Sequence, residues 1–234
     1  MKVAIMQPYF FPYIGYFQLI ANSDVFVIYD EIKYTKRGWI NRNRFLNNGK
    51  ATYFTLPLKK DSDFLYVSKR NLTDDWENEK KKISNQIKAA YHKAPFFKET
   101  YMLFEQCISH DNNNLFEFIY YSIKNICEYL QINTPIQVSS DLKISNDLKS
   151  AEKVKAICKA LKAATYINPI GGIELYDKSD FLNDNLELIF LKSKNILYTQ
   201  FENEFEPFLS ILDVLMFNDL KKVIELINTE FEIL

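Results

Sequence analysis

Residues 2–30 read KVAIMQPYFFPYIGYFQLIANSDVFVIYD, and this stretch sets the class of fold. Residues 2–6 form a short apolar segment, and residues 25–29 form a continuous apolar run between two aspartates, as is typical of a strand buried on both faces. Residues 13–21 carry apolar side chains at helical spacing, and Pro12 is expected to be the first residue of that helix. A strand, a helix and a second strand in this order predict an α/β fold with a βαβ-type open sheet at the N-terminus.

The rest of the chain alternates between strand-like and helical patterns. A pair of strands is expected at about residues 52–58 and 64–67, with Pro57 at an end or an edge. Apolar residues at helical spacing then predict three helices, with Asp74 and Asn112 among their N-caps, at about residues 75–91, 96–109 and 113–131. The pattern finally returns to α/β, with strands near 136–138, 166–168 and 186–191 and helices near 150–162, 209–217 and 220–227.

The chain has 234 residues, the length of one large domain or two small ones. The sequence contains no internal repeat, no Ser/Gly-rich linker and no low-complexity block that would mark an exposed hinge. We therefore expect a single domain over residues 1–234. Its α/β core spans about 1–70 and 135–234, and a helical lobe is inserted at about 75–131.

The composition excludes several classes of protein. Hydrophobic residues make up 47% and charged residues 25% of the chain, which are globular averages and exclude a disordered chain. The three cysteines lack CxxC spacing and predict neither a disulfide framework nor a metal site, so we expect buried, reduced thiols. No signal peptide opens the sequence and no apolar run reaches the ~18–20 residues of a membrane span, so a cytoplasmic protein is expected.

Residues 32–60 are a candidate anion-binding segment, because they contain eight basic residues and no acidic one in a chain of net charge -1. Three of the four arginines, Arg37, Arg42 and Arg44, lie in this segment. A guanidinium holds phosphate or carboxylate through two parallel hydrogen bonds, which a lysine ammonium cannot reproduce. Lys36 adds a further cation, and Tyr34, Trp39, Asn41 and Asn43 supply a stacking face and amide groups between the cations.

This combination of guanidinium, aromatic and amide groups predicts a site for a nucleotide diphosphate with an attached base or sugar. A solvated basic loop without a ligand is the alternative interpretation. A long nucleic acid is disfavoured as partner, because the segment is compact and the remaining chain is negatively charged.

The aromatic segment 9–17 is the second candidate, since six of its nine residues are aromatic. A surface loop does not ordinarily expose so much apolar area, so the segment is either a plug in the core or the wall of a pocket. It follows the first strand, at the carboxyl end where open α/β sheets bind ligands. Gln7, Tyr9 and Tyr16 are therefore candidate substrate-binding residues.

Asp30 is the preferred candidate for a general base, because a carboxylate at the carboxyl end of a strand can orient a ligand or take a proton. Asp24 and Glu31 also flank this strand. A salt bridge from Asp30 to Lys33 or Arg37 is an equally simple interpretation. His92 is the second catalytic candidate, with capping of a helix end as the alternative.

The motif residues resemble those of the WbqC-like protein family. The resemblance begins with QPYFFP at 7–12, GYF at 15–17, Asp24, Asp30, Tyr34, Lys36 and the WINRN segment at 39–43. It continues along the whole chain, through Tyr91, APFF at 94–97, Ser139-Ser140, Tyr166, Gly171-Gly172, Tyr176, Tyr198 and Phe205 to SILD at 210–213.

This resemblance implies an enzyme of bacterial surface polysaccharide biosynthesis, of the O-antigen and lipopolysaccharide kind. The implied reaction is the transfer of an acyl or aminoacyl group to a nucleotide-linked amino sugar, with an acyl- or aminoacyl-carrier thioester as donor and an acyl carrier protein as a partner. We expect Lys36, Arg42 and Asn43 to hold a diphosphate, and Asp30 or His92 to act as base. Asn41 or Asn43 would donate a hydrogen bond to the developing oxyanion.

Two alternatives stay open. A weaker similarity links the order of elements to nucleotidyltransferases of the HIGH type, which favours nucleotidyl or glycosyl transfer, although Pro12-Tyr13-Ile14-Gly15-Tyr16 stands where their diagnostic histidine pair would be. The second alternative is a non-catalytic module that binds carbohydrate or a partner through its exposed aromatic side chains.

Overall fold

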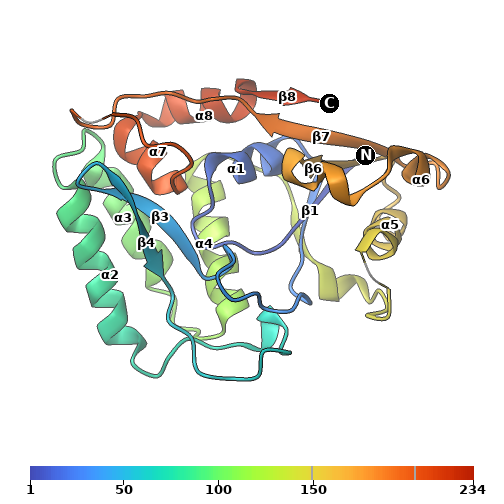
Figure 1. The fold of residues 1–234 in the computed structure, drawn as a ribbon, viewed down its shortest axis with the longest axis horizontal. Helices are drawn as coiled ribbons and strands as arrows, with labels where there is room; N and C mark the ends of the chain where they lie inside the picture. The colour runs from blue at the N-terminus through green and yellow to red at the C-terminus, as the bar shows by residue number, and fades with distance from the viewer. Residues whose placement is uncertain (149, 203) are drawn as a thin grey trace.

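A computed structural model describes residues 1–148, 150–202 and 204–234 (Figure 1). It contains a six-stranded sheet in the order β5-β2-β1-β6-β7-β8. Its first five strands run parallel and β8 pairs antiparallel to β7. The strands are β1 (Lys2–Met6), β2 (Val25–Ile28), β5 (Ile136–Val138), β6 (Thr165–Pro169), β7 (Glu187–Ser193) and β8 (Phe231–Ile233). This mixed α/β architecture with a mostly parallel open sheet confirms the predicted class of fold.

Helices cover both faces of the sheet. The strand β1 is paired on both sides, Val3 with Val25 of β2 and with Tyr166 of β6, and helices on both faces of the sheet bury its central side chains. On one face pack α1 (Ile14–Ala21), α7 (Ile211–Phe217) and α8 (Leu220–Thr229), and on the other α5 (Ser150–Ala160) and α6 (Lys178–Leu182). Side chains of β1 alternate between the two cores, with Ala4 in the first and Val3 and Ile5 in the second.

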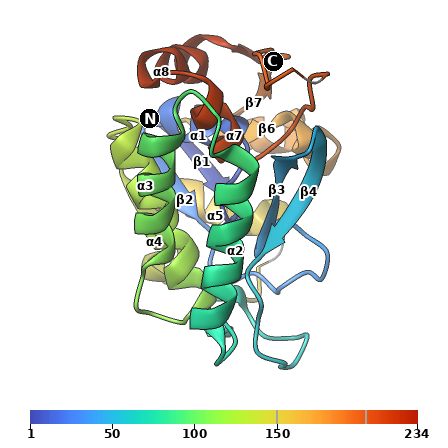
Figure 2. The same cartoon turned by 90° about the vertical axis from the view of Figure 1, so that its left-hand side faces the viewer.

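A helical insertion lies between the second and third strands of the parallel sheet in chain order, as predicted. It consists of α2 (Trp76–Tyr91), α3 (Phe97–Ile108) and α4 (Leu115–Tyr129), which face the viewer in Figure 2. Beside it lies an antiparallel hairpin of β3 (Arg42–Asn47) and β4 (Lys50–Thr55). Short 3₁₀ helices complete the described chain, η1 (Val67–Lys69), η2 (Ser139–Leu142) and η3 (Ile170–Leu175).

The position of the hairpin corrects the predicted strand pair at 52–58 and 64–67. The first strand begins at Arg42, and a two-residue turn at Asn48 and Gly49 joins it to the second. Both turn residues have positive φ, 50° and 74°, as the type I′ hairpin turn requires. The Asn-Gly pair was the sequence signal for this turn. Residues 64–67 contribute one isolated bridge, from Tyr66 to Lys33, instead of a strand.

Three predicted helix starts are also corrected. The helix α1 begins at Ile14 with Tyr13 as N-cap, so Pro12 lies just outside it. The N-cap of α4 is Asn114, whose side chain accepts a hydrogen bond from the Glu117 amide at 3.2 Å. The predicted cap Asn112 instead accepts from the Asn114 amide. The N-cap of α2 is Asp75, and Asp74 forms an ion pair with Lys59 at 2.5 Å.

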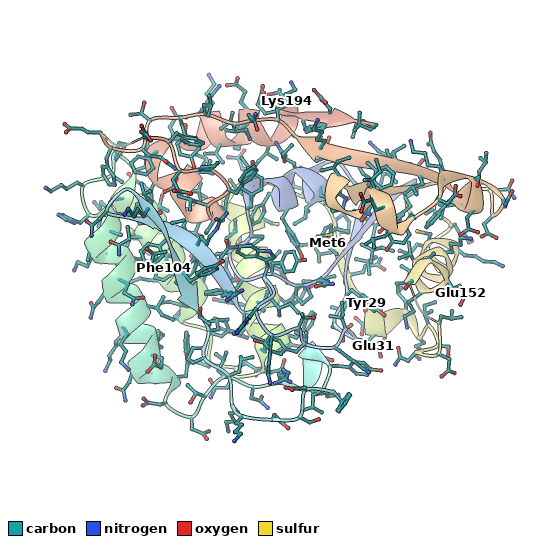
Figure 3. The ribbon with its side chains drawn as sticks, viewed as in Figure 1. Met6, Tyr29, Glu31, Phe104, Glu152 and Lys194 are labelled. Carbon is teal, nitrogen blue, oxygen red and sulfur yellow. The ribbon has the colours of Figure 1, made fainter. Side chains whose placement is uncertain are left out.

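The aromatic segment after β1 is mostly a plug in the core, one of its two predicted interpretations. The Phe10 and Phe11 rings are fully buried and lie 4.8 Å apart edge to face. Phe11 also packs against Phe104 of α3, which is labelled in Figure 3. These rings join the sheet to the helical insertion. The three cysteines are buried and reduced, as expected.

A buried carboxylate fastens the hairpin, the insertion and the C-terminal helices together. Asp213 of α7 is fully buried and accepts hydrogen bonds from the hydroxyls of Tyr91 and Tyr198, both at 2.7 Å, and from Gln200 Nε2 at 2.6 Å. The Tyr91 hydroxyl in turn accepts from the Leu46 amide at 2.7 Å. Burial raises the pKa of Asp213 from its usual 3.8 to about 6, because these neutral donors do not replace the lost water.

We expect Asp213 to make stability depend on pH. Because its pKa is higher in the folded than in the unfolded state, its contribution is fully present below about pH 4 and is lost as the pH rises through 6. At about 1.4 kcal/mol per pKa unit, the loss is roughly 3 kcal/mol. Urea unfolding at pH 4 and pH 7 should show that Asp213→Asn removes this part of the loss. An identical pH dependence in both proteins would contradict the assignment.

Candidate functional site

A cavity of about 410 Å³ opens at the carboxyl ends of β1, β2 and β6. The strand β1 is the point where the order of strands reverses, since the chain proceeds from β1 to β2 and β5 on one side and later to β6 and β7 on the other. Open α/β sheets bind their ligands at such a point. We call it the switch-point cavity, and its walls include Gln7, Tyr9, Tyr29, Lys153, Tyr166, Asn168, Gly171, Gly172 and Tyr176.

The walls of the switch-point cavity combine phenol rings with amide groups. The Tyr166 hydroxyl donates to Asn168 Oδ1 at 3.1 Å, which fixes the orientation of this amide. Burial raises the pKa of Tyr9, Tyr29 and Tyr166, so these phenols keep their protons and serve as hydrogen-bond donors. Such walls offer flat apolar faces together with polar groups of fixed direction.

An ion pair lies beside the switch-point cavity, of which Lys153 lines the cavity and Glu31 does not. Lys153 of α5 is 2% exposed, and its ammonium lies 3.6 Å from Glu31 Oε2. The ammonium also donates to the carbonyls of Ile144 and Ser145 and to Asn146 Oδ1. The Glu31 carboxylate accepts from Asn146 Nδ2 at 2.8 Å and keeps 19% of its side chain exposed. Figure 3 labels Met6 and Tyr29, which line the cavity, and Glu31.

A second, more open cavity of about 570 Å³ lies beyond the segment 32–34. Ile32 lines the switch-point cavity, whereas Tyr34 lines the second one. The Tyr34 hydroxyl donates to Asn41 Oδ1 at 2.9 Å, and the Arg70 guanidinium lies over the Tyr34 ring at 4.4 Å. We call it the Arg70 cavity, and its charged walls are Lys36, Lys59, Lys60, Asp61, Asp63 and Arg70.

Five of the predicted substrate-binding residues line these cavities. Gln7 and Tyr9 line the switch-point cavity, and Tyr34, Lys36 and Asn41 line the Arg70 cavity. Tyr16 is buried behind them and its hydroxyl donates to the Gln7 carbonyl at 3.0 Å, so it positions Gln7.

The arginines of the basic segment line neither cavity. Arg42 donates to the carbonyls of Gly38 and Arg37, and its guanidinium covers the Tyr53 ring at 4.6 Å. Arg44 donates to the Phe208 carbonyl and covers Trp39. Arg42 and Arg44 lie on the hairpin and line neither cavity, whereas Lys36 lines the Arg70 cavity. The joint binding of a diphosphate by Arg42 and Lys36 stays a prediction.

Asn43, another predicted ligand contact, forms hydrogen bonds to backbone groups of the loop after β1 and of the hairpin. It is 5% exposed, and its amide nitrogen donates to the carbonyls of Phe10 and Phe11 at 3.2 and 2.9 Å. Its Oδ1 accepts from the Arg44 amide at 2.8 Å. All three hydrogen bonds serve the backbone of the protein.

The two predicted bases differ in their surroundings. Asp30 is 4% exposed, and its Oδ1 accepts from Ser139 Oγ at 2.8 Å and from the Ser140 amide at 3.1 Å, which ties the ends of β2 and β5 together. No ion pair joins it to Lys33 or Arg37 in the described chain. His92 is exposed at the end of α2, where its ring nitrogen contacts the Ala89 carbonyl at 3.0 Å. This is the helix-end contact that formed its alternative interpretation.

Sequence reasoning missed Arg70, Lys153 and Asn168. Arg70 was the fourth of only four arginines, and its isolation from the other three hid its proximity to Tyr34. Asn168 stands at the end of a predicted strand just before Gly171-Gly172, a position at which a ligand-facing amide could have been proposed. Lys153 gave no signal, because a lysine on a helix is usually solvated.

Over residues 1–148, 150–202 and 204–234, no helix is both long and apolar enough to cross a bilayer. Within the same part of the chain, no three histidine, cysteine or acidic side chains gather as metal ligands would.

Comparison with known proteins identifies relatives. The model of the WbqC-like protein family matches residues 7–225. The uncharacterized protein Rv1507c of Mycobacterium tuberculosis is 29% identical over 218 residues, which cover 92% of this chain and 92% of the relative. No solved structure matches the chain.

The two glycines of the switch-point cavity make a matched pair of variants. A Cβ at Gly172 would lie 2.1 Å from Asn168 Nδ2, whereas a Cβ at Gly171 would meet no atom within 4 Å. We expect Gly172→Ala to displace the Asn168 amide and to lower the free energy of unfolding by about 1–3 kcal/mol. Gly171→Ala should change it by less than about 0.5 kcal/mol. Thermal and urea unfolding measure both, and equal effects would contradict this packing.

Proposed function

We propose a function for this chain from its membership of the WbqC-like protein family, to which it belongs over residues 7–225. The proposed function is that of an enzyme of bacterial surface polysaccharide biosynthesis. Its reaction is the transfer of an acyl or aminoacyl group from a carrier thioester to the amine of a nucleotide-linked sugar. The observation that carries this proposal is the switch-point cavity, because it combines a ligand-binding position of the fold with aromatic and amide walls and lies beside the Lys153–Glu31 ion pair.

The walls of the switch-point cavity suit a sugar ring. Tyrosine rings offer flat apolar faces to the C–H side of a pyranose, and their hydroxyls, with the amides of Gln7 and Asn168, can bond its hydroxyl groups. The cavity volume of about 410 Å³ lies within the roughly 300–1,000 Å³ of small-molecule sites. Its size therefore suits a sugar, with the nucleotide free to extend out of the cavity.

Transfer to an amine requires that the ammonium of the sugar first lose a proton. The freed nitrogen then attacks the thioester carbonyl carbon, a C–N bond forms, the C–S bond breaks, and the departing thiolate takes up a proton. Glu31 is our choice for the general base. Its carboxylate is partly exposed beside the cavity, whereas that of Asp30 is buried and already bonded to Ser139 and Ser140.

Asp30 keeps a positioning role in this proposal, because its contacts with Ser139 and Ser140 hold the chain that leads into Glu31. The oxyanion donor expected at Asn41 stays a prediction. The side chain of Asn41 donates to the Leu56 carbonyl at 2.8 Å and accepts from Tyr34, so it would need to exchange one of these partners.

We expect Glu31→Gln to lower kcat for N-acylation by about a hundredfold or more, since a positioned base contributes roughly 10²–10⁴-fold. The assay incubates the full chain with nucleoside-diphosphate-linked amino sugars and acyl or aminoacyl thioesters, and detects N-acylated product by mass spectrometry. Glu152→Gln is the matched control, because Glu152 is an exposed carboxylate beside Lys153 on α5 (Figure 3). Its kcat should stay within twofold of the wild-type value.

Absence of N-acylated product with every donor and acceptor would count against the acyl-transfer proposal. Equal loss of activity in Glu31→Gln and Glu152→Gln would instead count against Glu31 as the base, and leave the reaction class intact.

A carbohydrate-binding module is the second candidate, and an exposed aromatic face favours it. The side chains of Trp39 and Tyr53 are 39% and 48% exposed, and their rings lie 6.1 Å apart with a 30° tilt. The guanidiniums of Arg42 and Arg44 cover them. If this face binds glycan, quenching of tryptophan fluorescence by polysaccharide fragments should weaken in Tyr53→Ala, which keeps Trp39, while N-acylation stays unchanged.

A further inference from the structure

The Arg70 guanidinium is buried and forms no ion pair in the described chain, although Asp63 lies near enough for its pKa to be lowered mainly by Lys36 and also by Arg70. The residue is 4% exposed, and no carboxylate lies within ion-pair distance of it in the described ranges of the chain. Its Nη2 donates to the Ser62 carbonyl at 2.6 Å, while Nε is buried and has no hydrogen-bond partner in the described chain. A buried charge with an unsatisfied donor is costly, and a bound ligand is one way to complete it. Arg44 Nε and Trp76 Nε1 also lack a partner in the described chain, but neither lines the Arg70 cavity.

The surroundings hold this guanidinium in one orientation. One face lies over the Tyr34 ring at 4.4 Å, and the Tyr34 hydroxyl is itself fixed by Asn41. The backbone of Arg70 is anchored on both sides, since its amide donates to the Val67 carbonyl and its own carbonyl accepts from the Leu115 amide. Stacking on an aromatic ring leaves the edge of a guanidinium free to bind an anion.

The other charges of the Arg70 cavity favour an anion as well. Four cations and two carboxylates line it. Lys36 pairs with Asp63 at 2.9 Å, and Lys59 pairs with Asp74. Asp61 forms no ion pair in the described part of the chain. Lys60 and Arg70 therefore remain as cations without a carboxylate partner among the described residues.

We infer that the Arg70 cavity is a phosphoryl-binding subsite, in which Arg70 supplies the guanidinium fork and Lys60 a second positive charge. Phosphate suits it better than a carboxylate, because two cations among its walls match an anion of higher charge. The inference rests on the proposed function only for the molecule that carries the phosphate, a nucleotide-linked sugar. It also moves the diphosphate contact from Arg42 to Arg70.

Inorganic pyrophosphate is the probe that tests this subsite. It is titrated into the full chain by calorimetry, and by ¹H–¹⁵N spectra that resolve the arginine Nε–H groups. We expect the Arg70 Nε–H resonance to shift while those of the other three arginines stay in place. We expect Arg70→Lys to weaken binding about tenfold or more and Lys60→Ala about threefold.

Arg42→Lys is the matched control, because Arg42 also stacks on a tyrosine ring but lines neither cavity. Its affinity for pyrophosphate should stay within twofold of the wild-type value. Malonate, a dianion with carboxylates only, should bind at least about tenfold more weakly than pyrophosphate. Circular dichroism checks that each variant folds. If Arg70→Lys does not fold, the inference is tested by two other measurements. These are the shift of the Arg70 Nε–H resonance in the wild-type chain and the affinity of Lys60→Ala for pyrophosphate.

Three results would overturn the inference. The first is that pyrophosphate does not bind at concentrations up to about 10 mM. The second is an equal loss of affinity in Arg42→Lys and Arg70→Lys, and the third is equal affinity for malonate and pyrophosphate. The test is independent of turnover. A chain that binds pyrophosphate through Arg70 but forms no N-acylated sugar keeps the subsite and loses the proposed function. A chain that makes product with unchanged KM in Arg70→Lys loses the subsite alone.

Discussion

Two hydrogen bonds from the Asn43 side chain to the carbonyls of Phe10 and Phe11 are the constraint on which the arrangement of the molecule depends. Both carbonyls are surrounded by buried aromatic rings, where an unpaired polar group would cost free energy. By satisfying them, one side chain of the hairpin fixes the loop that follows β1. The same loop carries Gln7 and Tyr9 into the switch-point cavity, so a core contact determines the shape of the site.

The two cavities differ in how they are built. The switch-point cavity is a property of the sheet, because the carboxyl ends of β1, β2 and β6 meet there whatever side chains follow them. The Arg70 cavity depends on irregular chain between β4 and α2 and on one stacked pair, Arg70 on Tyr34. We therefore regard the first as the general binding position of the fold and the second as a specialised extension for charge.

The sequence predicted the regular parts well, because β1, α1, β2 and the three inserted helices carry strong apolar periodicity. The prediction missed the first strand of the hairpin. In that strand Arg42 and Arg44 alternate with the buried Asn43 and Phe45, and the charged residues make the segment look like a loop. Part of the candidate site could also be predicted. Gln7 and Tyr9 follow the first strand at its carboxyl end, and Tyr34 lies in the basic segment. The pairs Arg70–Tyr34 and Lys153–Glu31 join residues too far apart in sequence for local patterns to connect.

The central claim is that substrate chemistry takes place at the carboxyl ends of the parallel strands. A crystal structure with a nucleoside-diphosphate-linked amino sugar tests it most directly. The account predicts density for the sugar between Tyr9 and Asn168, with its amine at about 3 Å, hydrogen-bond distance, from the Glu31 carboxylate. Density only on the Trp39 and Tyr53 face, with an empty switch-point cavity, would contradict it.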